Sequence, residues 1–432
     1  MLITMKKEKN KKKKRISPAL AFVFTFVSVL VIGGMGMLGY CVITGRLSGE
    51  SVEEQEENVP KTDEETQSAF AFLWEAIPQE ETMTEEEEDT SRYGALLADE
   101  EAMKAGNVYA MPNREEGVVS LGFAGDVLLD DEYAVMANLL NRGVTIENGI
   151  SEETLTAMRG VDILMLNNEF PYTDRGTPLE GKTYTFRADT DAVGYLEDMG
   201  VDIVSLANNH CYDFGETGLL DTLVTLEEAG MPYVGAGRNL EEAVRPVYFI
   251  SGDIKIAIVS ATQIERLDNP DTKGATENSP GVFRCWNPEK LYEVVAEAKE
   301  NSDFVVVFIH WGTENVTEPD WAQLEQAPKL AEAGADLIVG AHPHCLQGVQ
   351  YYGDTPVFYS LGNFWFNSKT VDTGFLRVNI SKEGIESMQL VPAIQQDSRT
   401  AIVYGSEKER ILSYVESISY GVKIDGEGYI TR

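Results

Sequence analysis

The chain has 432 residues, 43% of them hydrophobic, which is enough for one large domain or for two or three modest ones. Its 71 acidic residues against 35 basic ones give a formal net charge of -36. Such acidity repels a phosphate backbone and excludes nucleic acid as the main partner, but it leaves open a small anionic substrate that is held through metal ions.

Residues 1–45 are predicted to anchor the chain in a membrane. Residues 1–18 form a basic tail, with eight Lys and Arg between positions 6 and 15. Residues 19–45 form the predicted transmembrane signal anchor, because a helix of 25 consecutive uncharged positions crosses a hydrocarbon core of about 30 Å. The basic run before it and the acidic run after it predict a single-pass protein with a cytoplasmic amino terminus and an extracytoplasmic remainder. A cleaved signal peptide, or lipoprotein cleavage at Cys41, is the alternative.

Residues 46–116 are predicted to be an acidic, largely disordered linker. Between positions 50 and 101 there are 19 Asp and Glu and only two basic residues, Lys61 and Arg92. Like charges at this density repel one another and keep the segment solvated. The apolar island at residues 70–74 predicts either a short transient helix or an interaction motif.

Residues 117–395 are predicted to form one continuous α/β domain, because strand-like and helix-like patterns alternate there. Strands are expected at residues 118–124, 162–166, 202–206, 255–260, 304–309, 336–339 and 357–360. Helices that stop at a glycine are expected at residues 190–199, 219–229 and 321–333. Repeated strand-helix units predict parallel pairing with right-handed crossovers.

The end of the chain has a different pattern. After Gly362 no further helix is expected, and segments 374–380 and 387–391 predict antiparallel strands packed on the edge of the domain. Residues 396–432 are expected to be a C-terminal extension that packs on the domain or trails from it.

All four histidines lie just past runs of β-branched and aliphatic residues. His310, His342 and His344 follow two such runs between residues 304 and 344, and His210 closes a similar phrase. Runs without polar residues are typical of strands that are buried on both faces of a parallel sheet. Open α/β folds bind their ligands at the carboxyl ends of such strands. Because histidine is the commonest metal ligand, this placement predicts a metal site.

The residues at the predicted strand ends supply the ligand types of a metal site. The candidates are Asp126, Asn167, Glu169, Asn209, His210, His310, His342 and His344. A mixed nitrogen and oxygen set without thiolates suits one or two divalent transition ions, Mn, Fe or Zn. A carboxylate such as Glu169 can bridge two cations about 4 Å apart, and such a pair binds phosphoryl oxygens and activates a water. The predicted chemistry is hydrolysis of a phosphate ester or anhydride.

Each candidate also has a purely structural interpretation. Asp126 could be only a helix N-cap, the pair Asn208–Asn209 could form an Asx turn, and His310 could be a satisfied core histidine. The His342–His344 run is more specific, because it would direct two imidazoles, two residues apart, to one side of an extended segment that contains a proline.

Three residues are candidates for substrate binding. Arg187, in the phrase TYTFRAD, could hold a substrate carboxylate or phosphate in a bidentate clasp, or it could form an ordinary surface ion pair. Asn363, in the phrase SLGNF, could line the floor of the site or serve a turn. Asn167 belongs to this group as well as to the strand-end set.

Seven phrases occur in order between Val118 and Pro392: GDVLLD, NNEFP, LANNHCYDFGETGLLDTL, VGAGRNLEEA, HWGTE, AGADLIVGAHPH and YSLGNF. Together they resemble the CapA family of poly-γ-glutamate capsule synthesis proteins, which have a calcineurin-like metallophosphatase fold. The resemblance implies a metallophosphatase-like α/β sandwich of mixed sheets. It also implies work on an anionic polymer or a phosphorylated substrate, beside other membrane subunits of capsule synthesis.

The resemblance further implies how the ligands are divided between two cations. One cation would be held by Asn209, His310 and His342. The other would be held by Asp126 and His344, and Glu169 would lie between the two.

The resemblance also implies a catalytic group and a departure from the pattern. His210 would stabilise charge or protonate the leaving oxygen. The metallophosphatase pattern expects a histidine two residues after Asp126, where this chain has Leu128. The cation at Asp126 therefore lacks one usual ligand.

Three functions are compatible with these observations. The leading one is a membrane-anchored, extracytoplasmic CapA-like protein that acts as a metal-dependent phosphoesterase-type hydrolase in poly-γ-glutamate or capsule synthesis or export. The second is a non-catalytic subunit that binds the polymer or scaffolds a membrane synthesis complex. The third is a cell-surface phosphodiesterase or nucleotidase unrelated to capsule, because a fold does not fix a substrate.

Overall fold

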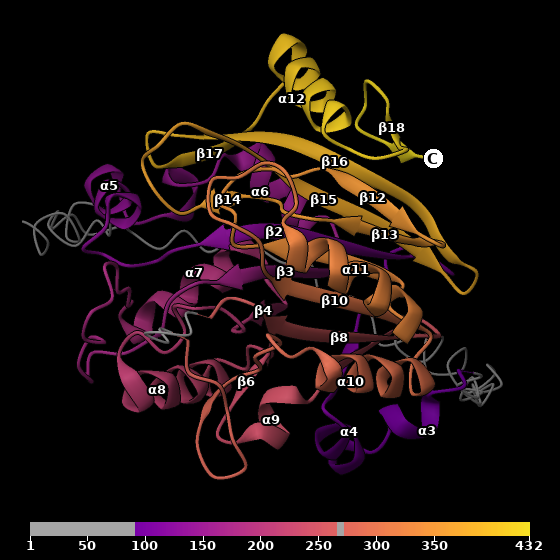
Figure 1. Ribbon diagram of the computed structural model, residues 1–432, viewed down its shortest axis with the longest axis horizontal. Coiled ribbons are helices and arrows are strands. Elements are labelled where there is room, and N and C mark those ends of the chain that lie inside the picture. The colour runs from indigo at the N-terminus through magenta and orange to yellow at the C-terminus, as the bar shows by residue number, and fades with distance from the viewer. Residues whose placement is uncertain (1–90, 266–271) are drawn as a thin grey trace, which may run out of the picture. The chain divides into compact units, whose positions relative to one another are not determined.

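The computed structural model describes residues 91–265 and 272–432 (Figure 1). The predicted basic tail (1–18), the signal anchor (19–45) and most of the acidic linker lie outside these residues. Among the helices of the described residues, none is long and apolar enough to span a membrane.

Two mixed sheets form the centre of the described chain (Figure 1). Within the described residues, sheet I has seven strands in the order β1 (Val108–Met111), β7 (Val247–Ser251), β8 (Ile254–Thr262), β10 (Phe304–His310), β11 (Leu337–Ala341), β13 (Thr355–Phe358) and β12 (Val349–Tyr352). Sheet II has eight strands there, in the order β17 (Arg399–Ile402), β16 (Gly384–Gln396), β15 (Val371–Ser381), β2 (Val119–Val127), β3 (Ile163–Asn168), β4 (Ile203–Ser205) and β5 (Tyr233–Val234), with β14 (Asn363–Trp365) paired to β2. The centres of both sheets, from β8 to β13 and from β2 to β5, are parallel.

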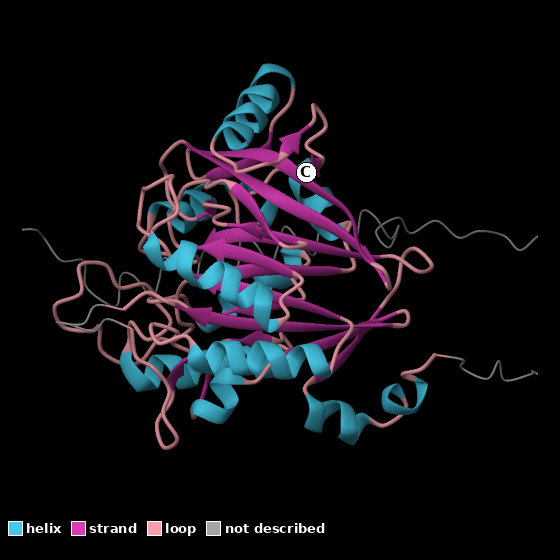
Figure 2. Ribbon diagram, turned by 45° about the vertical axis from the view of Figure 1, so that its right-hand side comes forward, coloured by secondary structure: helices cyan, strands magenta, loops and turns pink. Residues whose placement is uncertain are grey.

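Helices cover the outer faces of both sheets. Sheet II is covered by α5 (Ala134–Arg142), α6 (Glu152–Arg159), α7 (Gly194–Met199) and α8 (Gly215–Glu228), and sheet I by α10 (Glu289–Glu300) and α11 (Trp321–Ala333). The other elements are α3 (Gly94–Leu97), α4 (Glu100–Gly106), α9 (Leu240–Val244), α12 (Gly405–Ser417), the 3-10 turns η1 (Ile146–Asn148) and η2 (Thr190–Val193), and the strand pairs β6 (Ala236–Gly237) with β9 (Gly281–Val282) and β18 (Lys423–Ile424) with β19 (Ile430–Thr431). Figure 2 shows the strands between these helices, with most of the long loops at one end.

The sheets pack against each other through an apolar layer to which both contribute. In β10, Val306 and Phe308 belong to this inner layer, whereas Val305 and Val307 pack with α10 and α11. Side chains alternate along a strand, so the next inward position of β10 is His310. His310, at the carboxyl end of β10, therefore faces the same side as Val306 and Phe308, between the two sheets.

Helix α11 matches the helix predicted at residues 321–333 and shows the local signals that set its ends. The Asp320 side chain accepts hydrogen bonds from the backbone N–H groups of Ala322 and Gln323, and the Gln323 side chain accepts one from the Asp320 N–H (2.9 Å). This reciprocal capping fixes the first turn. The helix ends at Gly334, which adopts a left-handed conformation with φ of 113°.

The predicted α/β fold class is confirmed in its main features: two mixed sheets are layered with helices outside. Each predicted strand has a counterpart, and the parallel pairing holds in the sheet centres. The antiparallel segments predicted at 374–380 and 387–391 are parts of β15 and β16. Both are longer than predicted, and β15 pairs directly with β2.

The prediction of a disordered linker over residues 46–116 is wrong for its last part. Residues 94–111 contain α3, α4 and β1, and β1 extends sheet I by pairing with β7. The acidic composition of this segment predicts disorder and gives no sign of these helices and this strand. Asp99 is a helix cap that accepts a hydrogen bond from the Ala102 N–H (2.9 Å), and Val108 is buried.

The prediction that helices end after Gly362 is also wrong. Helix α12 buries Ile411, Leu412 and Val415 against the inner layer. These apolar positions recur at helical spacing but are few, so they are easily missed among charged neighbours. Because β17 also pairs with β16, the segment 396–432 is packed on the domain.

The half-buried carboxyl of Asp202 makes stability depend on pH. It accepts a hydrogen bond from the Leu164 N–H (2.8 Å), and burial raises its pKa from 3.8 to about 6. Because the folded pKa lies above the unfolded one, the stability contributed by this group is full below about pH 4 and is lost as the pH rises through 6. We predict that Asp202→Asn, which keeps an oxygen acceptor, raises the thermal unfolding midpoint by a few degrees at pH 8 and hardly at pH 4.

Melting curves at the two pH values measure this difference. The exposed neighbour Asp198→Asn serves as the control and should shift neither midpoint. An equal shift for Asp202→Asn at both pH values would contradict the role given to the charge of Asp202.

Candidate metal centre

Strands of both sheets end at one edge and bring the candidate residues together. In β3, Ile163 and Met165 face the inner layer, so strand alternation directs Asn167, and Glu169 just past the strand, to the same side. On the opposite sheet, His310 ends β10 beside the end of β11. The carboxyl ends of strands from both sheets therefore form one polar site.

Asp126 reaches the same site through an irregularity in β2. The register between β2 and β3 shifts just before Asp126, which then lies opposite Asn167 and, on its other side, opposite Asn363 of β14. Gly125 permits this close packing, because a Cβ there would lie 1.9 Å from the carbonyl oxygen of Gly362. Asp126 is therefore a strand residue, and its interpretation as a helix N-cap is wrong.

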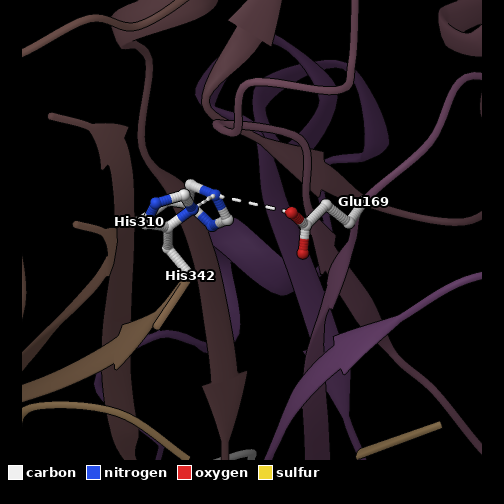
Figure 3. Close-up of side chains that lie close together, drawn as sticks. All are labelled: Glu169, His310 and His342. Carbon is white, nitrogen blue, oxygen red and sulfur yellow. Dashed lines mark hydrogen bonds and ion pairs between the residues drawn. The ribbon is translucent and has the colours of Figure 1, made fainter. Parts of the chain in front are cut away.

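The inner donor group consists of Glu169, Asn209, His310 and His342, all of them buried. His310 Nε2 lies 2.9 Å from Asn209 Oδ1 and 3.0 Å from His342 Nδ1. Figure 3 shows the Glu169 carboxylate pointing toward the two imidazoles, and its Oε1 is 3.7 Å from His310 Nε2. Two ring nitrogens and two oxygens thus face one another.

The outer donor group consists of Asp126, Glu169 and His344, whose ligand atoms lie within 4.8 Å of one another. His344 Nδ1 is 3.2 Å from Asp126 Oδ2 and 2.8 Å from Asn363 Oδ1. Asp126 and Glu169 are fully buried, and His344 is partly exposed. Because Glu169 belongs to both groups, it is placed to bridge two cations.

The chemistry of the donors fits a divalent cation. Glu169 Oε1 is buried and has no hydrogen-bond partner among the described residues, although buried charges are normally paired. Burial, and then the charge of Asp126, raises the pKa of Glu169 well above its ordinary value. Burial, with a contribution from the neighbouring histidines, lowers the pKa of His310 and of His342 well below the usual range, so both rings are neutral and offer a nitrogen lone pair. The mixed nitrogen and oxygen set suits Mn, Fe or Zn.

His342 and His344 are held by a strained turn, and the prediction of an extended segment is wrong. Both residues have positive φ, 98° and 57°. Such conformations cost about 1–3 kcal/mol each in a non-glycine residue and cluster at functional sites. The turn directs the His342 ring to the inner group and the His344 ring to the outer one.

Asn167 and Asn363, both predicted to bind substrate, lie behind the ligands. Asn167 is fully buried, and its Nδ2 donates to Asp126 Oδ1 (2.8 Å) and Glu169 Oε2 (3.2 Å). Asn363 is also buried and contacts the His344 ring. These positions let the two amides orient the ligands, which is the usual task of groups behind a metal site.

Asn208 makes the turn that presents the next two residues. Its Oδ1 accepts hydrogen bonds from the backbone N–H groups of His210 (3.0 Å) and Cys211 (2.9 Å), as in an Asx turn. Its Nδ2 donates to Asn167 Oδ1 (3.0 Å). The alternative of an Asx turn is therefore correct for Asn208, whereas Asn209 is a member of the inner donor group.

His210 lies beside the donor groups with a different set of partners. Its Nδ1 is 2.7 Å from Asp213 Oδ2, and its Nε2 is 4.0 Å from Glu169 Oε1. Asp213 also accepts from Lys182 Nζ and from the Phe186 N–H (2.7 Å). Phe186 packs on the imidazole with ring centroids 4.2 Å apart. Burial lowers the pKa of His210, against the opposing effect of Asp213.

Arg187 and Leu128 complete the predicted set. The Arg187 guanidinium lies over the ring of Phe214, 4.9 Å from its centroid, and the Arg187 N–H donates to Asp130 Oδ2 (2.9 Å). No ion pair to Arg187 occurs within the part of the chain that the structure describes. Leu128 is buried in the apolar cluster under the helices of sheet II, so nothing at that position can bind a cation.

Three residues of the site have no place in the predicted set. Asp213 lies three residues after His210 in the phrase NNHCYD, so its spacing was a usable signal. Glu314 closes the phrase HWGTE and lies near His342 and His344. Lys182 comes from a long loop after β3, and no pattern in the sequence singles it out.

Comparisons with known proteins identify the family of the chain. Residues 120–368 match the family model described as "Bacterial capsule synthesis protein PGA_cap". The "PGA biosynthesis protein CapA" of Bacillus subtilis (strain 168) is 31% identical over 288 residues, 64% of this chain and 72% of the relative. The "Capsule biosynthesis protein CapA" of Bacillus anthracis is 29% identical over 317 residues, 70% of this chain and 74% of the relative.

A 5'-nucleotidase structure from Candida albicans SC5314 aligns at a TM-score of 0.33 and 11% identity, over 63% of this chain and 54% of that chain. A score that low supports no conclusion about fold or chemistry. The family model covers more than half of the chain and spans the residues of both donor groups. The chain belongs to the PGA_cap family of bacterial capsule synthesis proteins.

Proposed function

We propose that this chain is a metal-dependent phosphoesterase-type hydrolase that acts in the synthesis or export of poly-γ-glutamate or a related capsule polymer. The observation that carries the proposal is the orphaned Glu169 Oε1, buried 3.7 Å from a neutral His310 imidazole. Such a carboxylate is costly to bury unless a cation pairs with it. The two Bacillus relatives are named for PGA and capsule biosynthesis, which supports the biological setting.

The two donor groups would hold one or two divalent cations. Asn209, His310 and His342 would hold the first, Asp126 and His344 would hold the second, and Glu169 would lie between them. When bound, such ions polarise a phosphoryl oxygen and lower the pKa of a water that attacks it.

His210 is the chain's own proton-transfer group. Because Asp213 accepts from Nδ1, the other nitrogen, Nε2, faces the space beside Glu169 and can exchange a proton with a leaving oxygen there. Asp213 is in turn held by Lys182, which is 5% exposed at the side chain, and by the Phe186 N–H. These contacts orient the ring, and Phe186 excludes water from one of its faces.

Arg187 is the cation that we assign to the substrate. It is half-buried, lies next to Phe186, and has no carboxylate partner among the described residues. In a chain with a net charge of -36, a guanidinium that packs on Phe214 and has no ion pair among the described residues offers an anionic substrate a bidentate contact. The substrate class is an anionic polymer or a phosphorylated precursor of it.

The proposal places the site outside the cell, anchored through residues 19–45 and beside other membrane subunits of capsule synthesis. The basic residues before that segment and the acidic residues after it support this orientation. A non-catalytic polymer-binding or scaffold role is the second candidate. It is favoured by Leu128, whose burial leaves the outer group with three protein donors.

The orphaned carboxylate yields a stability prediction. We expect Glu169→Gln to raise the thermal midpoint of the metal-free chain by several degrees, because burial and the charge of Asp126 disfavour the ionised form of Glu169 and the amide has no ionised form. The same change should abolish the stabilisation that Mn²⁺ gives the wild type. Thermal melts of the full-length chain in mild detergent, with EDTA or with Mn²⁺, measure both effects.

The exposed Glu197→Gln on α7 is the matched control and should melt like the wild type under both conditions. If Glu169→Gln melts below the wild type in EDTA, or if Mn²⁺ stabilises it equally, then this carboxylate is not a ligand.

Hydrolysis is tested with the full-length chain, Mn²⁺ and chromogenic phosphate monoesters and diesters. We expect His210→Ala to lower kcat at least about 100-fold and to leave Mn²⁺ binding unchanged. Asp213→Asn should lower kcat less and shift the pH profile, because the imidazole loses the group that orients it. Tyr212→Phe is the control and should change kcat by no more than about twofold.

A wild type that binds Mn²⁺ but hydrolyses none of these esters would contradict the hydrolase proposal. If His210→Ala then still supports capsule formation in cells, the scaffold role takes its place.

A further inference from the structure

His344 of the outer donor group is partly exposed, and the loop between β10 and α11 lies beside it. This loop carries Glu314, which is exposed. Its carboxylate, a nitrogen of His342 and a nitrogen of His344 lie within 4.8 Å of one another. No hydrogen bond or salt bridge engages this carboxylate within residues 91–265 and 272–432. The Glu314 carboxylate, which can bind a metal ion, therefore lies beside two histidines of the centre.

Two hydrogen bonds hold the Glu314 loop against the segment that carries the two histidines. The Asn315 N–H donates to the carbonyl oxygen of Pro343 (2.8 Å), and Gln347 Nε2 donates to the carbonyl oxygen of Val316 (2.9 Å). Asn315 has a φ of 59°, a left-handed conformation that asparagine tolerates. These contacts fix the backbone of the Glu314 loop relative to the histidine turn. The backbone of Glu314 therefore has its position before a cation binds.

The two histidines near Glu314 belong to different donor groups. His342 Nδ1 faces His310 Nε2 at 3.0 Å, which assigns that ring to the inner group. His344 is the member that the outer group and the Glu314 cluster share. Glu314 therefore adds a donor beside His344, whereas Leu128 is packed in the apolar cluster and adds none.

We propose that Glu314 is a further protein ligand of the outer cation, beside Asp126, Glu169 and His344. This inference rests on the metal centre of the proposed function. Two buried ligands would then fix the cation from below, and one exposed carboxylate would close the coordination from the solvent side. Because the Glu314 side chain is exposed, an oxygen of the substrate can displace it without disturbing the fold.

The test is a titration of the full-length, metal-free chain with Mn²⁺ in mild detergent, in which the electron paramagnetic resonance signal reports free Mn²⁺. We expect the wild type to take up two equivalents. Glu314→Gln should keep the first and weaken the second at least about tenfold. Glu318→Gln, an exposed glutamate on the same loop, should bind both like the wild type.

The outcomes of this titration distinguish a failure of the Glu314 inference from a failure of the proposed metal centre. If the second equivalent binds to Glu314→Gln within about twofold of the wild type, or if the wild type takes up only one equivalent, then Glu314 is not a ligand and the inner site still stands. If the wild type takes up no Mn²⁺, the metal centre itself fails.

Discussion

The burial of two neighbouring carboxylates is the constraint on which the rest of the centre depends. Asp126 and Glu169 are both fully inaccessible, and one oxygen of Glu169 has no partner in the described chain. Two such charges persist together only if a cation lies between them or if one takes up a proton. The surroundings are arranged for a cation, because neutral imidazoles and amide oxygens face the carboxylates and a buried amide, Asn167, donates to both.

The layered fold explains how these groups meet. Each sheet has a parallel centre, and the two share an apolar layer whose alternating pattern ends in polar residues. His310 and His342 come from sheet I, whereas Asp126 and Glu169 come from sheet II. A cation bound between them would tie the sheets together, so that metal binding would add to folding stability as well as to chemistry. The Ser205–Ser260 hydrogen bond (2.7 Å) joins the same two sheets.

The sequence was sufficient for the parts of the centre that follow from strand patterns. Uninterrupted apolar runs predict buried parallel strands, and the residues after them, such as His310, meet at one edge. The sequence was insufficient where an irregular backbone conformation sets the position of a ligand. The shifted register of Asp126 and the positive φ of His342 have no periodic signature. Lys182 acts through a buried contact with Asp213 that only the folded loop creates.

Anomalous scattering from crystals of the full-length chain grown with Mn²⁺ tests the central claim most directly. The predicted result is a peak about 2 Å from Glu169 Oε1 and from the facing nitrogens of His310 and His342, with or without a second peak beside Asp126. A map with no peak between these side chains, at a Mn²⁺ concentration that saturates known manganese enzymes, would contradict it.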